Sequence, residues 1–126
     1  MEKVLLVGIG GFLGSVARYL ISGYVQDRTG EFFPFGTLAV NVIGCFVIGG
    51  LSELAEARAF LSPETRALIV IGVLGGFTTF STFGNETVNL LRDGEWGFAM
   101  LNLLTHAVLA IGAVWVGRAT AHAIWR

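Results

Sequence analysis

Hydroxyl and phenylalanine side chains are concentrated in one short stretch of the chain, GGFTTFSTF, at residues 75–83. Gly75 and Gly76 lower the helix propensity, and the hydroxyls that follow can compete for backbone hydrogen bonds. These hydroxyls belong to Thr78, Thr79, Ser81 and Thr82. If a membrane helix is interrupted here, its freed carbonyls are ligands for a small cation, whereas its freed amides and hydroxyls are donors for an anion. The stretch therefore predicts a site for an ion.

The phenylalanines of this stretch favour the anion. Phe80 and Phe83 are three residues apart, so in a helix they share one face. Ring edges carry the positive end of the aromatic quadrupole, and edges flanked by hydroxyls can hold a dehydrated small anion weakly. The simpler alternative is that both rings only pack against lipid or protein.

Asn41 is a polar residue within the apolar stretch GTLAVNVIG. Its amide has two N–H donors and one oxygen acceptor that hydrocarbon cannot satisfy, so it must face another helix or a wet cavity. An interhelical hydrogen bond and a role in an ion path explain it equally well. Thr37 lies one turn earlier on the same face and extends the polar line.

Two charged residues and a histidine also lie in or near apolar stretches. Arg18 would cost about 3 kcal/mol at mid-membrane, so we expect it to snorkel to the interface or to attract anions at a pore mouth. Glu86 could balance Arg18 or lie at the same vestibule. His106 shares a helix face with Asn102 and is more simply a helix-helix hydrogen-bonding residue than a switch.

The composition requires these residues to be positioned by membrane helices. Of the 126 residues, 54% are hydrophobic and 13% are charged, against about 25% charged in soluble domains. Four apolar stretches are each long enough to cross a hydrocarbon core of about 30 Å. We therefore predict an all-α integral membrane protein, a single domain over 1–126, with spans at residues 3–25, 36–55, 64–91 and 96–122.

Local signals predict how the spans begin and pack. Ser62 followed by Pro63 predicts an N-cap and first helical residue. Glycines let helices approach closely, and the candidates for such packing are Gly8, Gly11, Gly44, Gly49 and Gly50. The first connection, QDRTGEFFPFG, carries Phe32, Phe33 and Phe35, which suit an interfacial aromatic belt.

Four spans place both termini on one side of the membrane. The basic residues counted on that side are Lys3, Arg58, Arg66, Arg118 and Arg126, against Arg28 and Arg92 on the other. This modest bias allows one orientation or insertion in both. Midplane transport sites are commonly built from inverted repeats, and no internal repeat is visible here, so we expect a second, inverted copy to complete the site.

Other classes of protein fit less well. A four-helix drug exporter needs an embedded carboxylate in its first helix, where this chain has Glu2 only at the start and Arg18 instead. A membrane scaffold would leave the interrupted span and Asn41 without a purpose. No nucleophile-base pair, metal cluster or basic cluster is visible, which argues against an enzyme and against nucleic-acid binding.

The strings GTLAVN and GGFTTFSTFGNE, on a four-span chain of this length, resemble the Fluc family of fluoride channels, the CrcB-type membrane proteins of microbes. The resemblance implies antiparallel, dual-topology homodimers in the cytoplasmic (inner) membrane, with two pores that export fluoride passively. It also implies a structural sodium ion (Na+) at the dimer centre.

Carried over by motif position, the resemblance implies a role for each site residue. The backbone carbonyls of Gly75 and Thr78 would bind Na+. The anion path would comprise Asn41, Phe80, Phe83, Ser81, Thr82 and Thr37, and the vestibule Arg18 and Glu86. The chain departs from the family where Ala110 and Val114 replace a polar track on the fourth helix.

Overall fold

The computed structural model describes residues 1–58 and 61–125, which form four helical spans. The first two spans are the single helices α1 (Glu2–Thr29) and α2 (Phe35–Arg58). The third comprises α3 (Pro63–Thr65), η1 (Arg66–Leu74), α4 (Gly75–Phe77) and α5 (Phe80–Arg92), and the fourth α6 (Trp96–Thr105), η2 (His106–Ala110) and α7 (Ile111–Trp125). All four are long and apolar enough to cross a membrane, so this is a multi-pass membrane protein.

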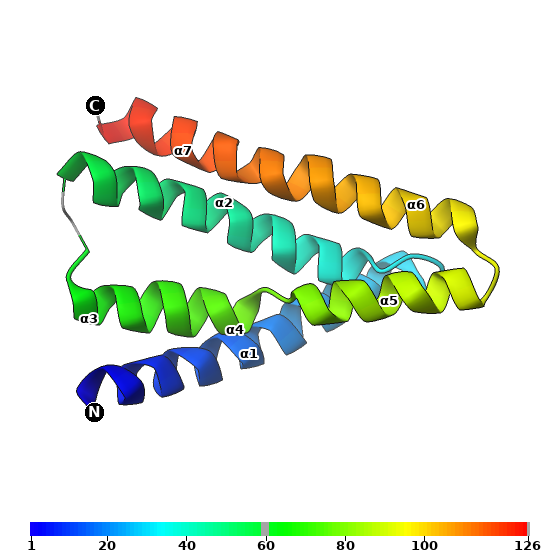
Figure 1. The fold of residues 1–126 in the computed structure, drawn as a ribbon, viewed down its shortest axis with the longest axis horizontal. Helices are drawn as coiled ribbons and strands as arrows, with labels where there is room; N and C mark the ends of the chain where they lie inside the picture. Colours follow the sequence, from blue (N-terminus) through cyan, green and yellow to red (C-terminus); the bar gives the residue numbers. More distant parts are fainter. Residues whose placement is uncertain (59–60, 126) are drawn as a thin grey trace.

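Successive spans run in opposite directions, which brings the N-terminus and the end of α7 to the same end of the bundle (Figure 1). In this bundle α2 packs chiefly on α7, and α1 packs chiefly on η1. Both η1 and η2 are π-helical where the sequence predicts ordinary helix, and the N–H of Gly75 reaches back five residues to the carbonyl of Val70. Such segments widen a helix locally and are frequent beside functional sites.

The close contact between α1 and η1 uses Gly10 and Gly14 in place of the predicted Gly8 and Gly11. A Cβ at Gly10 would meet the backbone carbonyl of Leu68, and one at Gly14 that of Val73, whereas Cβ atoms at Gly8 and Gly11 would meet nothing within 4 Å. The prediction for Gly8 and Gly11 is therefore wrong, because those positions do not face η1 with their Cα hydrogens.

The second helix follows the glycine prediction more closely. A Cβ at Gly49 would meet the carbonyl of Val114 in α7, and one at Gly44 would meet Thr78. Gly50 makes only ordinary contacts, with its nearest neighbour, the carbonyl of Gly117, at 3.6 Å. Small residues on facing helices thus bring α2 and α7 together.

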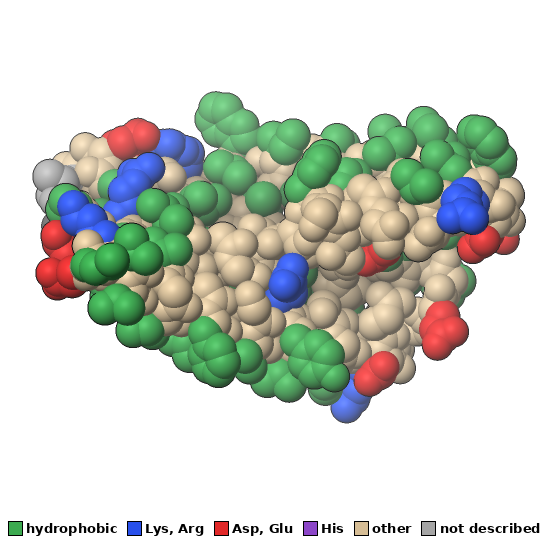
Figure 2. Space-filling view, turned by 60° about the horizontal axis from the view of Figure 1, so that its bottom comes forward, with side chains coloured by type: hydrophobic (Ala, Val, Ile, Leu, Met, Phe, Trp, Pro, Cys, Tyr) green, Lys and Arg blue, Asp and Glu red, His purple; other side chains and the backbone are tan. Residues whose placement is uncertain are grey.

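The outer surface is mainly apolar. Figure 2 shows hydrophobic side chains spread over the face in view and charged side chains gathered mainly toward its two ends. Of the predicted aromatic belt, Phe32 is exposed, but Phe33 is 2% exposed and packs beside Phe35 and Phe98. Phe33 is therefore a core residue, because the connection folds back over the bundle.

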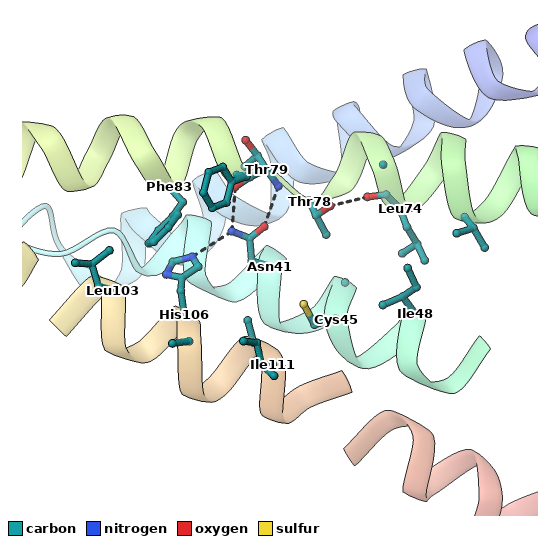
Figure 3. Close-up of a pocket in the computed structure, with 16 residues that line it drawn as sticks. Asn41, Cys45, Ile48, Leu74, Thr78, Thr79, Phe83, Leu103, His106 and Ile111 are labelled. Carbon is teal, nitrogen blue, oxygen red and sulfur yellow. Dashed lines mark hydrogen bonds between the residues drawn. The ribbon is translucent and has the colours of Figure 1, made fainter. Parts of the chain in front are cut away.

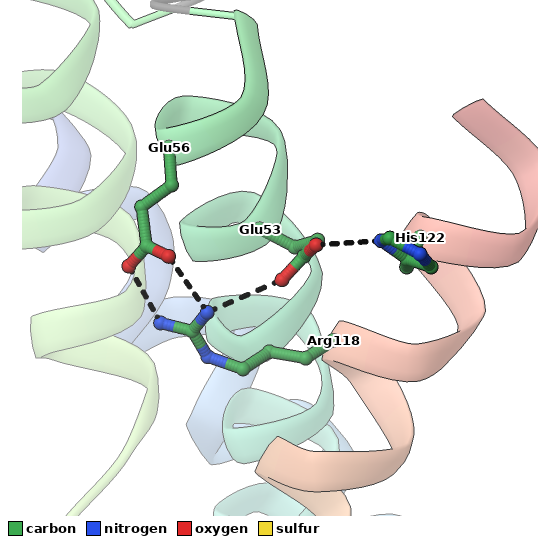
Figure 4. Close-up of polar contacts among 4 residues, drawn as sticks. All are labelled: Glu53, Glu56, Arg118 and His122. Atoms are coloured by element: carbon green, nitrogen blue, oxygen red, sulfur yellow. Dashed lines mark hydrogen bonds and ion pairs between the residues drawn. The ribbon is translucent and has the colours of Figure 1, made fainter. Parts of the chain in front are cut away.

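Polar contacts close the end of the bundle that carries the termini. Ser62 caps α3 by accepting the N–H of Thr65, with Pro63 as the first helical residue, as predicted. Arg118 of α7 bridges Glu53 and Glu56 of α2 at 3.2 and 2.8 Å, and His122 contacts Glu53 at 3.0 Å (Figure 4). Arg126, counted above among the basic residues, lies outside the described residues.

Candidate functional site

The third span leaves the helical conformation at two residues. Thr78 has φ −90° and ψ 158°, and Thr79 has φ −152° and ψ 114°, so both are extended between α4 and α5. Ordinary helical hydrogen bonds cannot continue through extended residues, and their peptide groups need other partners in an apolar setting.

Asn41 of α2 supplies these partners (Figure 3). Its Oδ1 accepts the Thr79 N–H at 2.8 Å, and its Nδ2 donates to the Thr79 carbonyl at 3.1 Å. The same Nδ2 lies 3.1 Å from Nε2 of His106 on the fourth span. Both amide hydrogens of Asn41 are therefore engaged, so the interhelical hydrogen-bond interpretation describes this arrangement.

The hydrogen bonds at the interruption leave two backbone carbonyls without their helical donors. In a continuous helix, the Gly75 carbonyl would accept the N–H of Thr79, which here donates to Asn41. The Thr78 carbonyl would accept the N–H of Thr82, which here donates to the Thr79 hydroxyl at 3.2 Å. Both carbonyls are thus freed from their helical donors. Free carbonyl oxygens are the ligand type that a hard cation prefers, so this donor set fits Na+.

Hydroxyls gather where α5 begins. Thr79 caps α5, and its hydroxyl donates to that of Thr82 at 3.0 Å, which leaves the Thr82 hydroxyl hydrogen available to another acceptor. Ser81 is exposed, with its Oγ 3.4 Å from the Thr79 hydroxyl. Thr82 and Ser81 can therefore donate to a bound group without losing the cap.

The two phenylalanines lie on one face, as their spacing predicts. The ring centroids of Phe80 and Phe83 are 5.5 Å apart, at an interplanar angle of 58°. Phe83 is half-buried and lies 4.1 Å from the His106 ring, whereas Phe80 is 82% exposed. A cavity of about 550 Å³ lies beside them and is also lined by Asn41 and Ala110.

Arg18 and Glu86 do not pair with each other. Arg18 lines a separate cavity of about 240 Å³ together with Thr37 and Thr82. Glu86 instead accepts the Thr37 hydroxyl at 2.6 Å, and its second oxygen is buried without a hydrogen-bond partner. The arginine thus stands at a small polar opening, with Thr37 between it and the carboxylate.

Thr37 and Asn41 reach the same span, as their shared face predicts. Thr37 contacts α5 through Glu86, and Asn41 contacts the extended residue Thr79 that precedes α5. On the fourth span, Ala110 and Val114 add no polar group.

Three further residues support the site, although the sequence predicts an individual role in it for none of them. Thr79 is the residue with which Asn41 forms hydrogen bonds, and threonine is a favoured N-cap residue. Asn102, which is fully buried, donates to Thr87 at 2.9 Å, and Thr87 donates to the Phe83 carbonyl at 2.8 Å. No local pattern indicates this chain of bonds between the third and fourth spans.

The chain resembles known proteins over nearly its whole length. The family described as "CrcB-like protein, Camphor Resistance (CrcB)" matches residues 5–118. Proteins named "Fluoride-specific ion channel FluC" are 48% identical in Opitutus terrae (96% of this chain, 93% of the relative) and 46% identical in Geotalea daltonii (98% and 100%). Another, from Geobacter sulfurreducens, is 49% identical (93% and 94%). These relatives are named as channels and not as enzymes, as the sequence predicts. The chain belongs to the CrcB-like family of membrane proteins.

Proposed function

We propose that this protein is a fluoride-selective channel that exports F⁻ passively across the cytoplasmic (inner) membrane. The observation that carries the proposal is the interruption at Thr78 and Thr79, where hydroxyls and phenylalanine rings meet in a chain whose relatives are named fluoride-specific ion channels. Fluoride enters cells as the neutral acid and becomes trapped as the anion at cytoplasmic pH, so a passive pore limits its accumulation.

The chemistry of the proposed path suits a small anion held weakly. Arg18 raises the local anion concentration at the opening that it shares with Thr82. The free hydroxyl hydrogen of Thr82 and the exposed hydroxyl of Ser81, once it turns from Thr79, replace part of the hydration shell, and the ring edges of Phe80 and Phe83 add a weak positive potential. Neutral donors allow the anion to leave again, which conduction requires.

The hydrogen bonds of Asn41 change the role that we assign to it, from a direct ligand of the anion to a support for the path. Because both amide hydrogens are engaged, an anion can take one of them only by displacing Thr79 or His106. We propose that Asn41 acts on the anion path by holding its backbone, with any direct contact to the anion made in competition with His106.

We further propose an antiparallel, dual-topology homodimer with a structural Na+ on its two-fold axis. Each chain offers the freed carbonyls of Gly75 and Thr78, and two inverted chains would offer four to one cation. Exposed Phe80 and Gly75 beside the cavity of about 550 Å³ are consistent with a second copy covering this face. Phe80 and Phe83 of one pore would then come from opposite subunits.

Flux from proteoliposomes tests the channel directly. Purified protein in fluoride-loaded vesicles should release F⁻ down its gradient when a potassium ionophore balances charge, and should not release chloride. Equal chloride flux would remove the selectivity proposal, and absence of fluoride flux would remove the channel.

Replacing each pore phenylalanine tests the aromatic part of the path. We expect Phe80→Ile and Phe83→Ile to lower fluoride flux about tenfold or more while the dimer survives, because isoleucine fills space without a ring quadrupole. Phe12→Ile is the matched control, since Phe12 is 69% exposed on α1 away from the cavity. Unaltered flux in both pore variants would exclude the phenylalanine mechanism.

The dimer and its ion need separate measurements. The mass of the detergent-solubilised particle should correspond to two chains, and a diffraction map of the dimer should place a ligand at Na–O distances on the axis. A monomer that conducts fluoride would contradict the dimer. A central ligand at water hydrogen-bonding distances would contradict the sodium site.

A further inference from the structure

The two ring nitrogens of His106 have different partners. Nδ1 lies 3.1 Å from the backbone carbonyl of Asn102, and Nε2 lies 3.1 Å from Nδ2 of Asn41. A carbonyl only accepts hydrogen bonds, so Nδ1 must carry the hydrogen. Nε2 of the neutral ring is then bare and accepts one amide hydrogen of Asn41.

This tautomer also sets the orientation of Asn41. Oδ1 of Asn41 accepts the N–H of Thr79, and one Nδ2 hydrogen of Asn41 is donated to the Thr79 carbonyl. The remaining Nδ2 hydrogen points to a nitrogen that can only accept. If the Asn41 amide were rotated by half a turn, both hydrogen bonds to Thr79 would break, and Oδ1 would face the lone pair of His106 Nε2.

The face of the same ring supports Phe83. The two centroids are 4.1 Å apart with the planes inclined at 35°, which is closer than the Phe80–Phe83 contact at 5.5 Å. His106 therefore contacts both the residue that holds the extended segment and one of the rings of the proposed anion path. It reaches them from the fourth span, where Ala110 adds no polar group.

We propose that His106 is a positioning residue of the channel, which as the neutral Nδ1–H tautomer holds the Asn41 amide with Nε2 and the Phe83 ring with its face. The inference deepens the proposed function and rests on it. His106 fixes where the extended segment and the phenylalanine lie relative to each other, since one rigid ring contacts both.

Two substitutions separate the two contacts. His106→Gln keeps an oxygen acceptor for Asn41 but has no ring, and His106→Phe keeps a ring beside Phe83 but has no acceptor. We expect each to lower fluoride flux about tenfold, which corresponds to about one lost interaction of 1.4 kcal/mol. The same substitutions at His122, which contacts Glu53 at the far end of α2, are matched controls and should leave flux unchanged.

Coupling to Asn41 distinguishes positioning from a general packing role. In the Asn41→Ala background, His106→Phe should lower flux less than about threefold further, because its hydrogen-bond partner is already absent. A full second loss would show that the two residues act independently and would overturn the proposal, as would wild-type flux in both His106 variants.

The tautomer is measurable without any flux. In a ¹⁵N-histidine NMR spectrum of the reconstituted protein, the directly bonded hydrogen of His106 should lie on Nδ1, and the signal is assigned because it is the one that remains in His122→Gln. A hydrogen on Nε2 would overturn the inference even if the variants fail to fold. Absence of fluoride flux from the wild type would instead remove the proposed function, so the two failures are distinguishable.

Discussion

Asn41→Ala is the substitution that the geometry addresses most directly. It removes the hydrogen bonds of Asn41 to the Thr79 N–H at 2.8 Å, to the Thr79 carbonyl at 3.1 Å and to His106 at 3.1 Å. Hydrogen bonds between membrane helices contribute about 0.6 kcal/mol on average and up to about 1.7, so three together contribute about 2 to 5 kcal/mol. Thr79 is buried, so water cannot fully replace the lost partners.

We therefore expect the free energy of unfolding to fall by about 2 kcal/mol or more, measured by equilibrium unfolding in mixed micelles or bicelles. Hydrogen exchange gives a local readout, since the Thr79 amide should be protected in the wild type and should exchange faster in the variant. Cys45→Ala is the matched control, because Cys45 is one turn further along α2 and lines the same cavity without a hydrogen bond to the extended segment.

A loss below about 0.5 kcal/mol relative to Cys45→Ala would refute this reasoning, because it would mean that the extended segment finds other partners at no cost. Unchanged exchange at Thr79 would refute it independently. Either result would also count against the proposal that Asn41 frees the Gly75 carbonyl by taking the Thr79 N–H.

Two further predictions concern packing and charge. Gly14→Ala should destabilise the protein by about 1–3 kcal/mol, because its Cβ would meet the Val73 carbonyl, whereas Gly8→Ala should be neutral or stabilising by up to about 1 kcal/mol; equal effects in thermal unfolding would contradict the observed helix contact. Arg118→Gln should lower the Tm slightly, with a difference that shrinks as salt is raised, and should leave fluoride flux unchanged, because its pair with Glu56 is largely exposed. A large, salt-independent loss would show that this pair does more than join two helix ends.

Several features of the site could be read from the residues alone because they depend on neighbours in sequence. Phe80 and Phe83 share a face since helical geometry sets their spacing, and Thr37 and Asn41 do so for the same reason. Hydropathy over about 20 residues is enough to predict the spans, because each must satisfy its own backbone in lipid.

Other features depend on how the helices are rotated and which of them meet. Gly10 and Gly14 pack against η1 and Gly8 and Gly11 do not, although all four belong to one glycine-rich string. Phe33 is buried and Phe32 is exposed for a similar reason, since the path of the connection decides which ring turns inward. Periodicity defines faces of a helix but not the neighbour that each face meets.

By itself the sequence determined that this is a four-span membrane protein of the CrcB-like family, with a stretch at residues 75–83 poorly suited to continuous helix. Only the tertiary structure decided how that stretch is satisfied. The partners of Thr79 come from Asn41, 38 residues away, and Asn41 in turn contacts His106, 65 residues further on. Such pairs form because an unpaired peptide group in an apolar interior is costly, and which side chain meets it depends on how the spans pack.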